Sequence, residues 1–418
     1  MMLYLRDATF VDWKSLRLRR GHLEVASGDA GKIRFVSRVP RGAEVLECSG
    51  RLVTKSFVIA HHHLYSALAC GMPGPKRAPK NFPDMLKQVW WNLDRALDED
   101  MVRACALAGG IAAAKAGTTF IIDHHSSPNA VRGSLDLIAS ALDEIGLGHL
   151  LCVELSDRDG KARREAALEE TDGYLRKRQG LVGLHASFTV GDELLDRAIA
   201  LAVGRDTGIH IHVAEALDDQ KACAQQHGMR VVQRLASTGI LESPKTLLAH
   251  GLHLNAAERT LFRSSRAWLV QNEESNQNNA VGGFDPKGLG NRLLLGTDGM
   301  HGDMLASTRA AYLAAQARGG MSPLDAYRKL RRAHDYLSTN GFQGDGDNNL
   351  VALDYAPATP VTERNLAGHF LFGMNSSHVE HVISGGKIIV KNRRMTRVDE
   401  DKILKDAAGQ TERLWRRL

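Results

Sequence analysis

Three consecutive histidines follow a short apolar run in the segment FVIAHHHL, residues 57–64. Successive side chains of a β-strand point to opposite faces, so His61 and His63 share one face and His62 lies on the other. Two imidazoles on one face can chelate the same metal ion. Such a pair also fits a solvated strand end, so its interpretation depends on partners elsewhere in the chain.

Further polar side chains end several later apolar runs. In HIHVAE, His210 and His212 share a face and Glu215 follows them. LLAHGLHL supplies His250, and LLLGTDG supplies Asp298 directly after apolar positions. A carboxylate in such a place is costly unless it is paired or bound to a metal. Three neutral imidazoles and one carboxylate suit Zn²⁺, with iron or manganese as alternatives, so the sequence predicts a site for a divalent metal ion.

The elements that would position these side chains begin after residue 53, where apolar runs alternate with longer helical stretches. Continuous apolar runs are typical of buried parallel strands, and eight of them can be counted up to RLLLGTDG, residues 292–299. This count predicts an α/β fold with a (β/α)8 barrel over residues 55–345, although an open doubly wound sheet fits it as well. The carboxyl ends of barrel strands carry the active site, which is where the histidines and acids lie.

Both ends of the chain have a different pattern. Residues 1–54 and 346–418 contain short strand-like pieces separated by turn signals, including a Gly385-Gly386 hairpin turn and a last helical stretch. We expect the two ends to form one small β-sandwich beside the barrel.

The composition is that of an ordinary globular protein, with 43% hydrophobic and 24% charged residues among 418. No apolar run approaches the roughly 18 residues of a membrane span, and the N-terminus lacks the apolar core of a signal peptide, so we expect a cytoplasmic protein. The five cysteines are scattered, which argues against disulfides and a cysteine-bound zinc. The net charge of +6 is dispersed, which argues against nucleic-acid binding.

The motifs FVIAHHHL, HIHVAE, LLAHGLHL, ESNQNNAVG and LLLGTDG, in this order, resemble the metal-dependent amidohydrolase superfamily. Within it they resemble the branch of adenosine, guanine and cytosine deaminases and triazine hydrolases. WWNLDRAL, IIDHHSSPNA and LAGHFLFGMNSSHV further resemble the aminohydrolases called SsnA. The resemblance covers essentially the whole chain and implies a barrel with a β-sandwich, assembled as a homodimer or higher homo-oligomer.

The resemblance also implies roles for individual residues. One divalent ion, most simply Zn²⁺, would be held by His61, His63, His212 and Asp298. Asp298 would also accept a proton, Glu215 matches the proton-shuttling glutamate, and His250 matches the histidine that orients the attacking water. The fourth strand carries no lysine that could bridge two ions, so a single-metal site is favoured.

Substrate contacts are harder to assign. His185 lies where relatives contact substrate, His210 is expected in the pocket or behind a ligand, and His301 borders the pocket. Trp90 and Trp91 fit a helical pattern and are expected to pack or to form a lid. The chain also departs from its relatives near the pocket, at residues 273–274, and before the first barrel strand, at residues 55–56, so substrate identity does not transfer.

Three functional hypotheses follow. The first is a hydrolase that deaminates an aromatic or cyclic amidine-like heterocycle of purine, pterin or pyrimidine type, with release of ammonia. The second is removal of another leaving group, such as halide or alkylamine, from a similar ring, or hydrolysis of a cyclic amide. The third is a non-catalytic structural relative, which predicts a decayed ligand set, whereas every position of the motif is present.

Overall fold

Eight parallel strands form a nearly closed barrel in the computed structural model, which describes residues 2–418. The strands are β6 (Phe57–His62), β7 (Thr118–His125), β8 (Gly148–Leu155), β9 (Val182–Ala186), β10 (Ile209–Val213), β11 (Leu247–His250), β12 (Trp268–Gln271) and β13 (Leu293–Leu295). Each pairs with the next in chain order, and the chain after β13 returns to β6 where the Thr297 amide donates to the His61 carbonyl at 3.0 Å. The predicted α/β barrel is confirmed.

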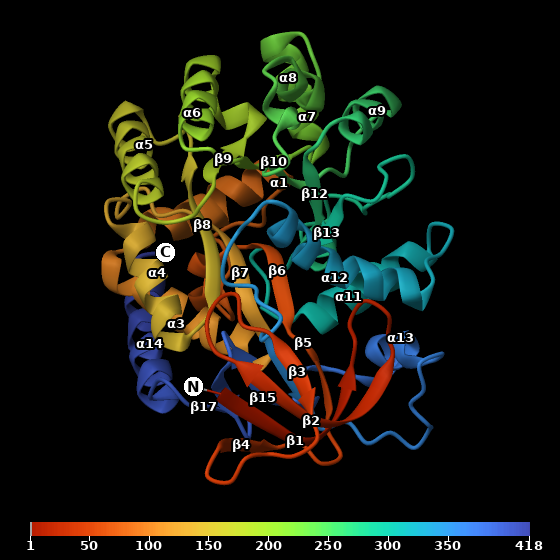
Figure 1. Cartoon of the computed structure of the whole chain (residues 1–418). Coiled ribbons are helices and arrows are strands. Elements are labelled where there is room, and N and C mark those ends of the chain that lie inside the picture. The colour runs from red at the N-terminus through yellow and green to blue at the C-terminus, as the bar shows by residue number, and fades with distance from the viewer. Residues whose placement is uncertain (1) are drawn as a thin grey trace.

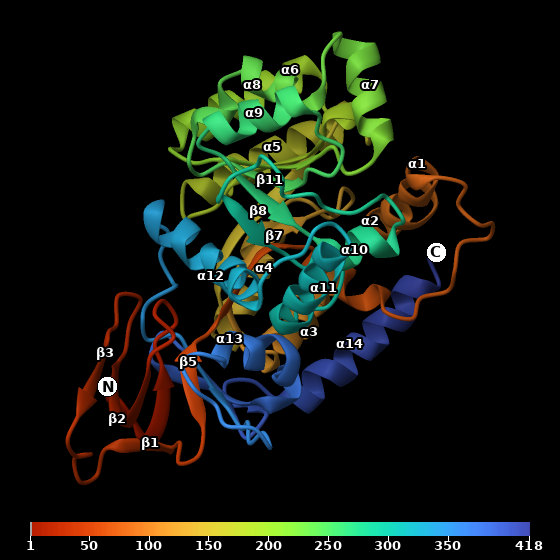
Figure 2. The same ribbon diagram turned by 90° about the vertical axis from the view of Figure 1, so that its right-hand side faces the viewer.

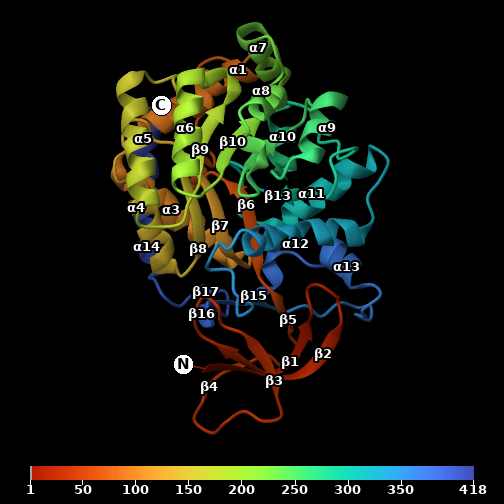
Figure 3. The same ribbon diagram turned by 45° about the horizontal axis from the view of Figure 1, so that its top comes forward.

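Helices follow the strands and enclose the barrel (Figure 1, Figure 3). They are α3 (Glu99–Lys115), α4 (Ser134–Ile145), α5 (Lys161–Leu175), α6 (Asp192–Gly204), α7 (Leu217–His227), α8 (Val231–Ser237), α9 (Ala256–Ser264), α10 (Glu273–Asn278), α11 (Met304–Gln316) and α12 (Pro323–Thr339). No helix among residues 2–418 is both long and apolar enough to span a membrane.

The lower part of the barrel interior is a packed apolar cluster. Strands around the circuit contribute Val58, Ala60, Phe120, Ile122, Leu150, Cys152, Leu247, Val270 and Leu294. Ala333, Tyr336 and Leu337 of α12 join this cluster, so α12 covers the amino-terminal end of the barrel. The polar strand ends therefore lie above a closed apolar floor.

One irregularity in β6 decides which histidines face the interior. Val58 belongs to the inner cluster, whereas Ile59 packs in the outer core. Unbroken alternation would then turn His62 inward and leave His61 outside. Between Ile59 and His62, however, three residues of β6 span the length of two residues of β7, which is a β-bulge. The bulge reverses the phase, so His61 and His63 face the interior.

The two chain ends share one nine-stranded sheet, seen below the barrel in Figure 1 and beside it in Figure 2. Its strands are β1 (Met2–Val11), β2 (Leu18–Ala26), β3 (Ile33–Val36), β4 (Glu44–Glu47), β5 (Leu52–Lys55), β14 (Leu350–Leu353), β15 (Val379–Ser384), β16 (Lys387–Lys391) and β17 (Arg394–Met395). β5 and β14 pair antiparallel, with Lys55 opposite Leu350, and so join the two ends.

A buried ionic group connects this sheet to the barrel. Lys55 Nζ lies 2.8 Å from Asp345 Oδ1, and His334 Nδ1 lies 2.7 Å from Asp345 Oδ2. Arg331 of α12 donates to the carbonyls of Lys55 and Ser56 at 2.9 and 2.8 Å. The Lys55-Ser56 departure noted in the sequence is therefore part of the contact between the sheet and α12.

The chain between β6 and α3 lies over the carboxyl ends of the strands. It contains η1 (Leu64–Ala69), α1 (Phe82–Met85), the π-helical turn η2 (Leu86–Trp90) and α2 (Trp91–Ala96). Single π-helical turns are frequent at functional sites. The last helix, α14 (Glu400–Trp415), runs along α3 (Figure 2). Trp415 Nε1 donates to the Leu68 carbonyl at 2.9 Å.

Candidate metal centre and active site

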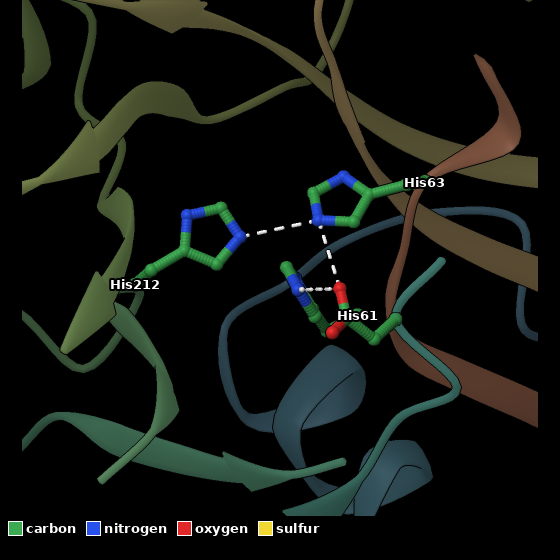
Figure 4. A group of neighbouring side chains, drawn as sticks. His61, His63 and His212 are labelled. Carbon is green, nitrogen blue, oxygen red and sulfur yellow. Dashed lines mark hydrogen bonds and ion pairs between the residues drawn. The ribbon is translucent and has the colours of Figure 1, made fainter. Parts of the chain in front are cut away.

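Three histidines and one aspartate converge at the carboxyl ends of the barrel strands. His63 Nε2 lies 3.1 Å from His212 Nε2 and 2.9 Å from Asp298 Oδ1. His61 Nε2 lies 3.4 Å from the same carboxylate oxygen. The four potential ligand atoms all lie within 4.8 Å of one another. Figure 4 shows the three imidazole rings pointing toward a common centre.

The other ring nitrogen of each histidine, Nδ1, is hydrogen-bonded to a group outside the centre. His63 Nδ1 donates to the His124 carbonyl at 2.6 Å, and His212 Nδ1 donates to the His185 carbonyl at 2.7 Å. His61 Nδ1 is hydrogen-bonded to His210 Nε2 at 2.8 Å. Engagement of Nδ1 fixes the ring and leaves Nε2 for the centre, which is the usual arrangement around metal-binding histidines.

The donor set fits a divalent metal ion. His61 Nε2 is buried and has no hydrogen-bond partner among the described residues, although burying an unpaired polar atom is costly. An ion at the centre would satisfy it. Asp298 adds a negative charge, because its contacts with His61 and His63 outweigh burial and hold its pKa well below the usual range. Three nitrogens and one carboxylate are donors typical of zinc sites.

Two further polar residues lie beside this group. His250 Nε2 is 3.7 Å from Glu215 Oε2 and 3.8 Å from Asp298 Oδ2, and it too is buried without a hydrogen-bond partner. Asn276 Oδ1 accepts from His250 Nδ1 at 2.8 Å and so sets the orientation of the ring. Burial raises the pKa of Glu215 to about 7, which lets this carboxyl hold a proton near neutral pH.

The backbone at three strand ends is strained. Ala214, His250 and Asp298 have φ angles of 48°, 73° and 53°, in the left-handed region that residues other than glycine seldom adopt. They follow or end β10, β11 and β13, where the chain turns out of the barrel. Such strain is concentrated at functional sites, and here it accompanies the side chains that face the centre.

The cavity above the centre is lined by more residues than the sequence motifs indicate. His63, His212, Glu215, Ser275 and Asp298 form its floor. Its walls include Tyr65, Phe82, Leu86, Trp90, Trp91, Asp94, Glu154, Arg158 and His185. Trp90 and Trp91, expected to pack or form a lid, therefore line the cavity, and they do so from the segment that covers it.

The three residues expected near substrate lie in different surroundings. His185 lines the cavity, with Nδ1 2.6 Å from Thr189 Oγ1. His210 is fully buried behind His61 and is not among the lining residues. His301 is not among the lining residues either; its Nε2 is 2.9 Å from Glu274 Oε1, and its side chain is 44% exposed.

The charged wall made by Asp94, Glu154 and Arg158 is not predicted by the sequence motifs. A signal for Glu154 existed, because alternation along β8 puts Leu150, Cys152 and Glu154 on the inner face. Asp94 and Arg158 had no such signal, since their positions depend on the π-helical turn and on the loop after β8.

Comparison with known proteins agrees with this geometry. The model of the amidohydrolase family matches residues 52–330, and the chain belongs to that family. It is accordingly a hydrolase acting on carbon–nitrogen bonds, as the sequence motifs predicted.

Two relatives are similar over most of the chain. The 5-methylthioadenosine/S-adenosylhomocysteine deaminase of Halobacterium salinarum is 27% identical, over 92% of this chain and 92% of its own. The 5'-deoxyadenosine deaminase of Methanopyrus kandleri is also 27% identical, over 79% of this chain and 80% of its own.

Solved structures share the fold at lower identity. An adenosine deaminase from Xanthomonas campestris with bound zinc superimposes with a TM-score of 0.83 at 19% identity, covering 99% of this chain and 98% of that one. The zinc complex of an atrazine chlorohydrolase from Arthrobacter aurescens gives 0.83 at 15% identity, covering 98% and 100%.

Proposed function

We propose that the protein deaminates an aromatic or cyclic amidine-like heterocycle of purine, pterin or pyrimidine type and releases ammonia. The observation that carries the proposal is the position of Glu215 and His250 beside the His61, His63, His212 and Asp298 group. The relatives named for deamination of adenosine-type compounds support the same chemistry.

The metal would be held by His61, His63, His212 and Asp298. When bound, a divalent ion supplies a nucleophile by lowering the pKa of water to about 7. Zn²⁺ is the candidate ion, because the donor set suits it and because zinc is present in two structural neighbours. We propose a single ion.

The proton transfers would fall to this chain's own carboxylates. Asp298 Oδ2 accepts a proton from the attacking water while His250, 3.8 Å away, holds the nucleophile in line. Attack on a C=N carbon builds charge on the ring nitrogen, which must be neutralised. Glu215 delivers its proton to that nitrogen, takes the proton of the new hydroxyl group as the carbonyl forms, and passes it to the amine as the C–N bond breaks. The proton that Asp298 accepted from water then restores Glu215.

A specific observation also supports a second candidate. Triazine hydrolases are among the structural neighbours, and one of them is an atrazine chlorohydrolase. The same attack on a ring carbon with a different leaving group would release halide or alkylamine. This alternative needs no change in the residues that activate water.

Ammonia release by the zinc-loaded protein, measured across purines, pterins and pyrimidines, tests the proposal. Chloro- and alkylamino-substituted rings in the same panel test the alternative through chloride or amine release. Release of chloride or alkylamine without ammonia would favour the alternative. If none of these compounds is hydrolysed although one equivalent of zinc is bound, both the proposal and the alternative are overturned.

We further propose a cytoplasmic homodimer or higher homo-oligomer. Sedimentation of the purified protein at low micromolar concentration measures the assembly, and a monomer alone would contradict it.

A further inference from the structure

One wall of the cavity is built from buried charges. Arg158 Nη2 is paired with Asp94 and lies 2.9 Å from Glu154 Oε1, while Arg158 Nε lies 2.9 Å from Asp159 Oδ2. The side chains of all four residues are 7% exposed or less. Asp94, Glu154 and Arg158 line the same cavity as His212, Glu215 and Asp298.

The charges in this wall do not balance. Three buried carboxylates surround one buried guanidinium, and Arg95, whose side chain is 38% exposed, adds one more cation through its 2.7 Å contact with Asp159. One negative charge is left over. A buried charge without a partner is costly, so the wall favours a ligand or a proton that cancels it.

An oxygen of Asp94 is left to receive such a ligand. Asp94 Oδ2 accepts from Ser126 at 3.2 Å and pairs with Arg158, whereas Asp94 Oδ1 is buried without a hydrogen-bond partner among residues 2–418. The side chain of Asp94 is 2% exposed and belongs to the cavity wall. This oxygen is therefore a buried acceptor beside the cavity, with no protein donor assigned to it.

The pKa values of Asp94 and Glu154 agree with an excess of negative charge in the wall. Burial raises the pKa of Asp94 to about 7 and raises the pKa of Glu154 as well, although Arg158 opposes both shifts. The wall thus holds one proton readily in the absence of a cation. Aromatic side chains lie beside it, since Arg158 Cζ is 5.1 Å from the Trp91 ring and Trp90 lines the same cavity.

We propose that Asp94 and Glu154 select substrates whose part remote from the metal group carries a positive charge, over neutral and anionic substituents. A cation there would pair with Asp94 Oδ1, neutralise the excess charge and lie next to aromatic faces that attract cations. An anionic substituent would be repelled by Asp94 and Glu154, because the wall already carries an excess negative charge. The substrate class is then a heterocycle bearing a protonated amine or a guanidinium-like substituent. This assignment of the substrate class rests on the proposed deamination.

Binding of phenylguanidinium and phenylurea to the zinc-loaded protein tests this selection. The two probes have nearly the same shape and differ in charge, and isothermal titration calorimetry gives both affinities without turnover. Because the cation would cancel the excess negative charge of the wall, we expect phenylguanidinium to bind at least tenfold more tightly than phenylurea, a difference of about 1.4 kcal/mol.

Two isosteric variants identify the wall as the cause. In Asp94→Asn and in Glu154→Gln the preference should fall to within about threefold, by loss of phenylguanidinium affinity. Asp100→Asn is the matched control, because Asp100 is a carboxylate of the neighbouring helix whose side chain is 72% exposed in its pair with Arg413. It should keep the full preference. Thermal unfolding checks that each variant is folded. If only one of the two wall variants folds, that variant alone is enough for the test.

Equal binding of the two probes, binding of neither, or a preference unchanged in both folded wall variants would overturn the inference. The ammonia panel separates it from the proposed function. A protein that prefers phenylguanidinium but deaminates no ring would contradict the function and leave the selection standing. Deamination with equal kcat/KM for aminoalkyl- and carboxyalkyl-substituted forms of the same ring would retain the function and contradict the selection.

Discussion

The two oxygens of Asp298 have different partners. Oδ1 faces His61 and His63, whereas Oδ2 accepts from Ser275 at 2.5 Å and lies 3.8 Å from His250. One oxygen can therefore bind a metal while the other takes part in proton transfer. Glu215 lies beside His250. Asp298 can therefore accept the proton of water while Glu215 protonates the ring nitrogen.

Glu215→Gln tests the proton-transfer role. The amide keeps the shape of the side chain but cannot give up a proton, and general acid–base catalysis contributes about 10² to 10⁴-fold in rate. We expect kcat to fall by at least about two decades with zinc content and substrate binding retained. Turnover within threefold of the parent, with normal zinc content, would remove Glu215 from the mechanism.

Zinc content separates His62 from the histidines of the convergent group. His62 makes a 2.8 Å hydrogen bond to Thr297 Oγ1 and lies outside the convergent group, so His62→Ala should retain the metal. His63→Ala should lose most of it, and so should His212→Ala. Plasma emission spectroscopy on dialysed protein measures this, and equal loss in all three variants would show that the ligand assignment is wrong.

At the scale of elements, strand alternation predicted much of the site. Pairing His61 with His63 and His210 with His212 follows from it, and the family and the barrel are confirmed. The ligand and catalytic roles stay predictions. The sequence does not reveal the bulge in β6, since a register shift arises only when β6 and β7 pair. Nor does it reveal that Asp94 lines the cavity, because the position of Asp94 in α2 depends on the preceding π-helical turn.

The contact between α14 and η1 gives a prediction at this scale. Trp415 donates to the Leu68 carbonyl, and η1 carries Tyr65 and Ser66, which line the cavity. Trp415→Ala removes the hydrogen bond and the packing, so amide hydrogen exchange over residues 64–69 should accelerate while the barrel strands stay protected. Trp415→Phe keeps most of the packing and should give an intermediate effect. Unchanged exchange in Trp415→Ala would show that α14 does not hold η1.

At the scale of the whole molecule, the sheet and the barrel depend on the buried group at Lys55, Asp345 and His334. Breaking a buried ion pair by removing one partner costs about 3–5 kcal/mol, because the other charge is left unpaired. We expect Asp345→Asn to lower the free energy of unfolding by an amount in this range at pH 7. Asp206→Asn is the control, since Asp206 pairs with Lys245 at 3.0 Å but its side chain is 98% exposed.

The same variant has a pH signature. Burial raises the pKa of Asp345, but His334 and Lys55 outweigh it and hold the pKa below its usual value. A lowered carboxyl pKa stabilises the fold above the pKa of the unfolded chain, near 4, and this contribution disappears as the pH falls through the folded value. Urea unfolding from pH 7 downward should show the parent and Asp345→Asn converging below about pH 4. A constant difference would contradict the assignment.

The pairing of β5 with β14 also has a consequence for biosynthesis. A nascent chain folds from its amino terminus as it emerges, and β5 leaves the ribosome long before Leu350–Leu353 exists. Until then, the edge of β5 that β14 will cover carries unpaired backbone amides and carbonyls. All eight barrel strands are therefore synthesised before the last four strands of the sheet beside them. The last sixth of the chain completes this sheet by adding β14 to β17, and truncation before residue 350 would leave the edge of β5 open to other chains.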